Sequence, residues 1–483
     1  MEDTSKKTVA KGILWNAIQL IINTAFTLGI RLVLAKLLLP KEFGIVGMAV
    51  VFTGFVQILN DLGISAALVQ KKEELLTDAH YYTAFWTGVS FSIVLYSIVC
   101  FALGPLVAMF YHEPVLTKLI PVISLGILAS PVNLIHKTQL TKRMDFKRIA
   151  IIDNTSNIIA GCLSLGLAFL GAGVWALVFN SVANIVIAMP LYFATTRWKP
   201  KFIWDNKAFK EIFGFGIYAT FTNIIGYLMN NVDYLLIGRL LGPGALGIYT
   251  FAFTLTDAFR GRLLQVVNNV MYPLYGKIQS DSSALKRYYL KVVNYNSIVI
   301  NPIMLLLLVI GEPIVINLFG AKWSGSVYPL KILALSVMMH LLVNSNTALI
   351  RGMGRAALEM NLQIFKSLIY IPTLIVGIYY NGIIGAAWAV LLNKIFAVIL
   401  AQYTFNRLLK IEFGTMEFLN AVKYSWVASF AAFIVGYYLF QNQHVNYILV
   451  GLLMMLIYCL TIYLMMKDLI ISEFKELKVA KNK

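Results

Sequence analysis

Charged residues are scarce in this sequence, and three long stretches contain none. Asp, Glu, Lys and Arg make up 13% of the 483 residues, and the mean hydropathy is +0.76. None of the four occurs from Ala79 to Tyr111, from Asn154 to Thr196 or from Tyr424 to Met466. This composition argues against a soluble protein. About 20 apolar residues cross a bilayer, so the second and third stretches predict two membrane-spanning helices each.

The sequence also lacks the motifs of enzymes and metal proteins. Cys100, Cys162 and Cys459 lie singly in apolar segments, without metal or redox spacing. There is no Gly-rich nucleotide-binding loop, no metal-spaced cluster of His and Cys, and no nucleophile motif. We therefore predict no metal, no cofactor and no catalytic residue, and a protein that is not an enzyme. We expect an ion gradient, the membrane potential or a substrate gradient to drive any transport.

Hydropathy predicts an all-α polytopic membrane protein with about fourteen transmembrane helices. Helices are favoured over a β-barrel because the apolar segments are twice as long as a strand and lack period-2 alternation. The expected helices lie at residues 13–37, 44–69, 82–110, 116–136, 149–170, 173–195, 211–238, 245–272, 290–310, 327–350, 357–380, 383–406, 418–440 and 445–466.

The formal net charge of +18 would indicate nucleic-acid binding in a soluble protein, but here the basic residues follow membrane topology. With a cytoplasmic N-terminus, most of the 40 Lys and Arg fall in inner loops. The outer loops contain Lys36, Lys41, Lys118, Arg239 and Lys322. The positive-inside rule then places both termini in the cytoplasm. We expect no nucleic-acid partner, and only secondary contact of residues 142–148 with anionic membrane lipids.

One segment of the chain occurs twice. Residues 32–52, LVLAKLLLPKEFGIVGMAVVF, return at 235–255 as LLIGRLLGPGALGIYTFAFTL, and both copies keep the Pro and Gly of a turn. The two copies lie 203 residues apart. A repeat unit of that length is too large for a solenoid and indicates two homologous lobes. The shift spans six helices, so the lobes share one orientation in the membrane. The predicted domains are 1–196 (helices 1–6), a cytoplasmic inter-lobe linker at 197–210, 211–410 (helices 7–12), and 411–483 (helices 13 and 14 and a basic tail).

Polar residues follow one face of the first predicted helix and of its repeat partner, the seventh. They are Asn16, Gln19, Asn23 and Thr27 in the first helix and Asn223 and Asn230 in the seventh. Steps of three and four place such residues on one helical face. Each can make hydrogen bonds between helices, which contribute about 0.6 kcal/mol on average in membranes. The matching stripes in both lobes favour a water-filled central cavity, with Asp61 of the second helix as a gating or ion-coupling candidate.

Charges inside predicted spans are stronger signals, because a charge at the bilayer centre costs at least about 2.5–3.5 kcal/mol. The cations are Arg31, Arg260, Arg262, Lys366 and Lys394, and the anions are Asp233 and Asp257. The positive balance predicts a cationic lumen that binds an anionic substrate. Arg31, Arg260 and Lys394 are the first candidates for substrate contact, with Arg262 and Lys366 next. No acidic residue lies within a helical turn of Lys394.

The two acidic residues are candidates for gating or ion coupling, and each has an alternative role. Asp257 lies three residues before Arg260, so the two can simply neutralise each other. Asp233 lies one residue from Arg31 in the register of the repeat, which gives either a gate salt bridge or independent structural pairs. His340 shares a helical face with other polar side chains, and a hydrogen-bonded core histidine is favoured over a proton relay.

Short motifs occur in a fixed order along the chain. They are LPKEFG at 39–44, DLGI at 61–64, ALVQ at 67–70, RMDF at 143–146, DYLLIGRLLG at 233–242 and GIY at 247–249. In these motifs the chain resembles the polysaccharide transporter (Wzx-type flippase) family of the multidrug/oligosaccharidyl-lipid/polysaccharide exporter (MOP) superfamily.

That resemblance implies a flippase with two six-helix lobes around a cationic cavity. Its substrate would be undecaprenyl-diphosphate-linked oligosaccharide, moved across the bacterial plasma membrane by alternating access. The product would serve lipopolysaccharide O-antigen, capsule or exopolysaccharide biosynthesis, with polysaccharide polymerase machinery as a further partner.

Two other functions are alternatives. A cation-coupled drug exporter of the same superfamily would need acidic residues in its lumen, whereas the charges here are mainly basic. A membrane polysaccharide polymerase or ligase would need a sizeable outer loop carrying acid and base residues. The longest predicted outer loop, residues 311–326, is short. The flippase is therefore favoured over both.

Overall fold

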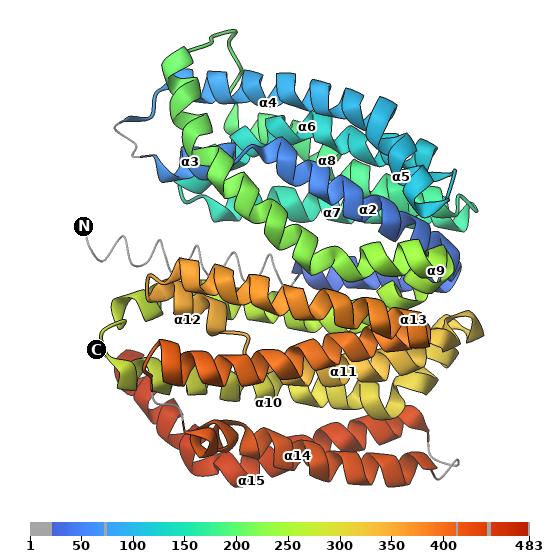
Figure 1. The fold of residues 1–483 in the computed structure, drawn as a ribbon, viewed down its shortest axis with the longest axis vertical. Helices are drawn as coiled ribbons and strands as arrows, with labels where there is room; N and C mark the ends of the chain where they lie inside the picture. Colours follow the sequence, from blue (N-terminus) through green and yellow to red (C-terminus); the bar gives the residue numbers. More distant parts are fainter. Residues whose placement is uncertain (1–21, 72–74, 412–413, 442–445, 482–483) are drawn as a thin grey trace. The chain divides into compact units, whose positions relative to one another are not determined.

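The computed structural model describes residues 22–71, 75–411, 414–441 and 446–481 (Figure 1). These segments are helices joined by short connections, without a β-strand among the described residues. Eleven helices of the described chain are long and apolar enough to cross a membrane. The protein is therefore an all-helical multispan membrane protein, as predicted.

The two longest helices, α9 (Asn206–Lys277) with 72 residues and α13 (Ala356–Tyr403) with 48, are each interrupted by a break. α9 has a non-helical residue at Gly242, where φ is +81°. α13 has a break at Asn381 and Gly382. Both breaks fall where the sequence predicts an outer loop between two helices. The helix at residues 22–37 is too short in its described part to count among the candidate spans.

The chain divides into two compact units, Met1–Thr250 and Phe251–Lys483, and the division falls inside α9. In the first unit, α6 packs against α2, α4 and α8. The helices of this unit are residues 22–37, α2 (Pro40–Asp61), α3 (Ile64–Gln70), α4 (Asp78–Ile98), α5 (Gly104–Tyr111), α6 (Leu116–Lys142), α7 (Phe146–Phe169), α8 (Val174–Thr196) and α9 up to Thr250.

The two copies of the repeated segment contact each other within the first unit. A Cβ atom at Gly44 would lie 1.7 Å from the carbonyl oxygen of Pro243. In the same way, a Cβ atom at Gly247 would lie 1.8 Å from the carbonyl oxygen of Pro40. Only glycine at both positions permits this backbone approach. The turn Pro and Gly that mark the repeat in the sequence therefore form a reciprocal contact between α2 and α9.

The predicted linker at 197–210 lies against α4. The Trp198 ring stacks on Tyr82 with centroids 5.5 Å apart, and Trp86 Nε1 donates a hydrogen bond to the Lys201 carbonyl (2.9 Å). Where the linker enters α9, Glu211 accepts hydrogen bonds from Lys71 and His80. These bonds, with that from Lys71 the stronger, hold the pKa of Glu211 below its usual range.

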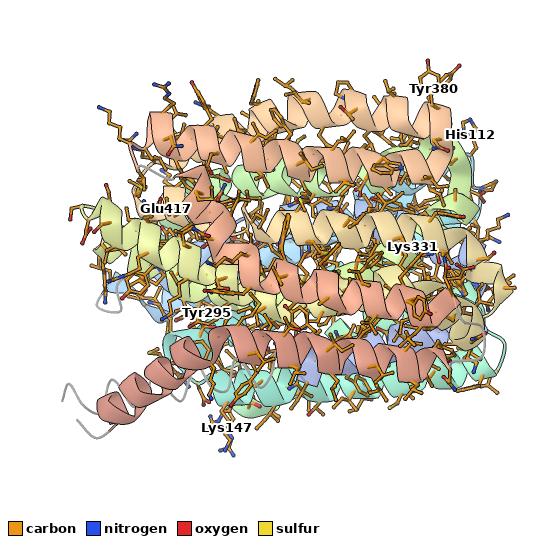
Figure 2. The ribbon with its side chains drawn as sticks, turned by 90° about the horizontal axis from the view of Figure 1, so that it is seen from below. His112, Lys147, Tyr295, Lys331, Tyr380 and Glu417 are labelled. Carbon is orange, nitrogen blue, oxygen red and sulfur yellow. The ribbon has the colours of Figure 1, made fainter. Side chains whose placement is uncertain are left out.

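In the second unit, α11 packs against α10 and α13, and α14 and α15 pack against α10. Its helices are the remainder of α9, α10 (Ser282–Ile314), α11 (Val327–Leu341), α12 (Asn346–Gly352), α13, α14 (Thr415–Gln441) and α15 (Tyr447–Lys481). The two halves of α13 approach closely, because a Cβ at Gly385 would lie 1.8 Å from the Gly377 carbonyl oxygen. Figure 2 places Glu417 toward one end of these helices and Lys331 and Tyr380 toward the other.

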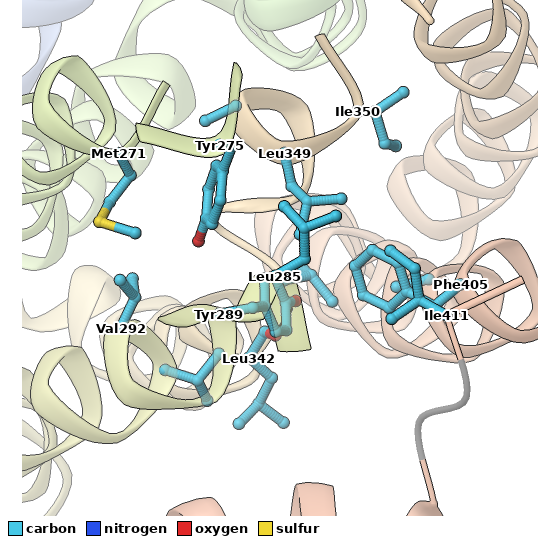
Figure 3. Close-up of a cluster of buried hydrophobic side chains, with 14 of the residues drawn as sticks. Met271, Tyr275, Leu285, Tyr289, Val292, Leu342, Leu349, Ile350, Phe405 and Ile411 are labelled. Atoms are coloured by element: carbon cyan, nitrogen blue, oxygen red, sulfur yellow. Dashed lines mark hydrogen bonds between the residues drawn. The ribbon is translucent and has the colours of Figure 1, made fainter. Parts of the chain in front are cut away.

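The predicted tenth helix is interrupted at residues 342–345, between α11 and α12. Two buried tyrosines from neighbouring segments bind this interruption (Figure 3). The Tyr289 hydroxyl lies 2.8 Å from the Leu342 carbonyl oxygen, and the Tyr275 hydroxyl lies 3.1 Å from Ser345 Oγ. Polar backbone inside a membrane protein needs such partners. The tyrosines thereby fix the end of α11, one residue after His340.

Candidate functional site

Arg260 of α9 is the residue around which the candidate site of the second unit is built. Its Nε donates a hydrogen bond to Asp257 Oδ1 (2.8 Å), and Nη2 forms an ion pair with the same carboxylate. Its Nη1 lies 2.7 Å from Nδ1 of His340 on α11. The Arg260 side chain is 17% exposed and that of Asp257 34% exposed. The predicted Asp257–Arg260 pair is therefore present, and it is joined to a second helix through His340.

Two lysines of α13 belong to the same site. The positive charges of Lys394, Arg260 and Lys366 all act electrostatically on His340. Lys366 and Lys394 are both half-buried, although they lie in different halves of α13 on either side of its break. The fold of α13 therefore brings two predicted lumen cations to one histidine. We call Arg260, Lys366, Lys394 and His340 the cationic cluster.

Polar groups on the same helical face extend this cluster along α11 and the segment after it. The amide nitrogen of Asn344, one turn beyond His340, is buried and has no hydrogen-bond partner within the described part of the chain. Thr347 Oγ1 donates to Glu359 Oε1 (3.3 Å), and Glu359 also pairs with Arg351 (2.9 Å). Asn344 thus supplies an unused donor beside the cations.

His340 is the member of the cluster to which the sequence assigned only a structural role. Its contact with Arg260 joins residues 80 positions apart, and no local pattern reveals that α9 and α11 meet there. Its polar neighbours at three- and four-residue steps were the available signal. The predicted residue Arg262 also lies on α9, but its side chain falls outside the described residues.

The polar stripe of the first predicted helix is described only in part, since Asn16 and Gln19 precede the described residues. Asn157 Nδ2 on α7 donates hydrogen bonds to Asn23 Oδ1 and Thr27 Oγ1, each at 2.9 Å. Asn23 and Thr27 therefore make hydrogen bonds between helices, which was the alternative to lining a water-filled cavity.

The other predicted residues of the first unit are spread over it. Arg31 is exposed on the helix at 22–37, and Asn223 and Asn230 are exposed on α9. Asp233 is buried and accepts a hydrogen bond from the Tyr249 hydroxyl (2.9 Å). Asp61 accepts one from Ser65 N–H (3.4 Å). A gate between Arg31 and Asp233 stays a prediction.

Metal-binding chemistry has no candidate within the described ranges. No group of three or more His, Cys, Asp or Glu side chains is placed to hold a metal ion there. The donor set of the cationic cluster, three cations and an imidazole, suits an anion instead.

The fold has counterparts among solved membrane transporters. It matches the lipid II flippase MurJ in an inward closed conformation with a TM-score of 0.74 and 16% identity, over 95% of this chain and 100% of that one. It matches an inward-facing multidrug resistance MATE family transporter with a TM-score of 0.64 and 14% identity, over 80% and 95% of the two chains. These likenesses define the class: a multispan protein with the fold of the MOP superfamily.

The family follows from the sequence itself. A family model described as "Polysaccharide biosynthesis protein" matches residues 33–328, more than half of the chain. The chain therefore belongs to this polysaccharide biosynthesis family of Wzx-type transporters, as its motifs indicated.

Named relatives agree with this membership. The chain is 26% identical to the lipopolysaccharide biosynthesis protein WzxC of Escherichia coli over 82% of this chain and 80% of that protein. It is 25% identical to the teichuronic acid biosynthesis protein TuaB of Bacillus subtilis over 84% of each. It is 23% identical to the succinoglycan biosynthesis transport protein ExoT of Rhizobium meliloti over 73% and 70%. The family is one of transporters rather than enzymes.

Proposed function

We propose that this protein is a flippase for undecaprenyl-diphosphate-linked oligosaccharide in the bacterial plasma membrane. The cationic cluster is the observation that carries the proposal. Arg260 of α9 contacts His340, and Lys366 and Lys394 from the two halves of α13 act on it electrostatically, although isolating charges within a membrane protein is costly. A substrate with two phosphate groups would compensate these charges through charge-assisted hydrogen bonds.

The range of glycans among the relatives supports the diphosphate as the recognised part. WzxC, TuaB and ExoT are named for lipopolysaccharide, teichuronic acid and succinoglycan, three different polymers. A site shared by such transporters is best matched to the lipid-linked headgroup that the substrates have in common. For this chain the glycan would be an O-antigen, capsule or exopolysaccharide repeat.

The proposed mechanism is alternating access between two six-helix lobes, residues 1–196 and 211–410, followed by helices 13 and 14. Splitting α9 at Gly242 and α13 at Asn381–Gly382, and adding the helix at residues 22–37, would bring the eleven candidate spans to fourteen, which supports this count. We place both termini in the cytoplasm, as the distribution of Lys and Arg predicts. Arg31 and Arg262 would add to substrate contact, and polymerase machinery would receive the product.

Leaflet accessibility of the lipid-linked oligosaccharide tests this function. In right-side-out membrane vesicles, a membrane-impermeant glycosidase should cleave glycan when the wild-type protein is present and little without it. Lys394→Ala and Arg260→Ala should lower the cleaved fraction by at least about tenfold, because each removes a charge-assisted contact.

The control is Lys331→Ala, since Lys331 lies near the start of α11, pairs with Glu312 of α10 (3.5 Å) and is outside the cluster. It should transport like the wild type. Equal cleavage with and without the protein would refute the flippase function. Unchanged transport by both cluster variants at normal membrane levels would refute the site.

A further inference from the structure

The hydrogen bond between Arg260 and His340 defines the protonation state of the histidine. A guanidinium has five N–H donors, no acceptor, and stays charged in proteins. At a separation of 2.7 Å, Arg260 Nη1 must therefore donate and His340 Nδ1 must accept. The imidazole of this structure is neutral, with its proton on Nε2.

The surroundings of His340 are basic on the helices that face it. α9 contributes Arg260 and Asp257, and α13 contributes Lys366 and Lys394. Glu359 acts on Lys366 from the start of α13. α10 contributes the apolar residues Ile300 and Met304 to the neighbouring core cluster. Asp257 offsets the charge of Arg260, from which it accepts a hydrogen bond.

Three of the five N–H donors of Arg260 bind groups of the protein itself. Asp257 accepts from Nε and from one N–H of Nη2, and His340 accepts from one N–H of Nη1. A phosphate group that binds the guanidinium through two N–H groups therefore competes with these acceptors for Nη1 and Nη2. The neutral imidazole holds the guanidinium less strongly than the carboxylate does, so His340 is the acceptor that yields.

We infer that His340 is a proton-linked positioning residue, which takes up one proton on Nδ1 when an anionic phosphate group displaces it from Arg260. This inference rests on the proposed function and deepens it. The arriving anion compensates the lysines and the arginine, and the freed Nδ1 becomes a donor to the phosphate once it is protonated. When the anion leaves, the proton leaves and the contact between Nδ1 and Arg260 returns.

The sign of the coupling follows from linkage. If anion binding promotes protonation of His340, protonation must promote anion binding by the same factor. Affinity for the anion should therefore rise as the pH falls. For uptake of a single proton, the dissociation constant changes by at most about tenfold per pH unit.

Sulfate binding to the purified full-length protein tests the inference. Sulfate stays doubly charged between pH 6 and pH 8, so its own titration does not contribute. The wild type should bind sulfate about tenfold or more tightly at pH 6 than at pH 8. In His340→Gln the amide oxygen can still accept from Arg260, so binding should persist with a dissociation constant that is nearly independent of pH. Lys331→Ala, which changes a lysine outside the cationic cluster, should keep the pH dependence of the wild type.

The outcomes separate this inference from the proposed function. A wild type that binds sulfate with no pH dependence, or a His340→Gln protein with the full pH dependence, would overturn the proton link and leave the anion site in place. Loss of the pH dependence in Lys331→Ala would also overturn it. Failure of Arg260→Gln and Lys394→Gln to weaken sulfate binding would overturn the anion site itself, and the proton link with it.

Discussion

Replacing Gly44 or Gly247 by alanine should lower the melting temperature of the protein by about 1–3 °C or more. The added Cβ would lie less than 2 Å from a backbone carbonyl oxygen, of Pro243 in one case and of Pro40 in the other. Backbone cannot rotate away as a side chain can, and overpacking of this kind costs about 1–3 kcal/mol or more. At about 2 cal/mol/K of unfolding entropy per residue, such a cost lowers the melting temperature of a 483-residue chain by about 1–3 °C.

Gly226→Ala is the matched control for the glycine prediction. Gly226 also lies in α9, and nothing lies within 4 Å of a Cβ built there. Alanine stabilises a helix relative to glycine by about 0.5–1 kcal/mol, so this variant should melt at or above the wild-type temperature. Thermal unfolding of the three variants in one detergent makes the comparison. If all three melt together, the contact between the repeats does not contribute to the fold.

Removing Arg260 should reduce glycolipid translocation by about a hundredfold, the largest functional loss that we expect. The substitution removes charge-assisted hydrogen bonds of about 1.5–3 kcal/mol each. It also leaves the Asp257 carboxylate facing the anionic substrate without its partner. In Asp257→Ala, by contrast, the guanidinium keeps its charge and loses a competitor, so substrate binding should tighten.

The double variant Asp257→Ala/Arg260→Ala separates a structural role from a functional one. Without either charge the bundle avoids an uncompensated carboxylate, so membrane levels should recover relative to Arg260→Ala alone. Translocation in proteoliposomes should stay low, because the guanidinium is still missing. A double variant that translocates like the wild type would show that the pair serves only to neutralise itself.

The sequence predicted the membrane class, the helical spans and the family, because each depends on local apolar runs or short motifs. The contact between Asp257 and Arg260 could also be predicted from the sequence, since it joins residues three apart on one helix. The breaks at Gly242 and Asn381–Gly382 fall where apolar runs end, so they were predictable as loops.

Contacts between distant segments could not be predicted from the sequence. The repeat marked Gly44 and Gly247 as equivalent, but nothing in the pattern showed that the two copies touch. Likewise, a polar stripe does not say which helix it faces, and Asn23 proves to bind Asn157 of α7. His340 stood out only as a member of a polar helical face. Its importance depends on how α9, α11 and α13 pack.

Binding of undecaprenyl diphosphate to the purified protein in nanodiscs measures the central claim most directly, with uncharged undecaprenol as the reference lipid. The wild type should bind the diphosphate lipid at least about tenfold more tightly than undecaprenol. Arg260→Ala and Lys394→Ala should each remove most of that preference, and Lys331→Ala should keep it. Equal affinity of the wild type for both lipids, or a preference that survives loss of Arg260 and Lys394, would contradict the cationic cluster as the headgroup site.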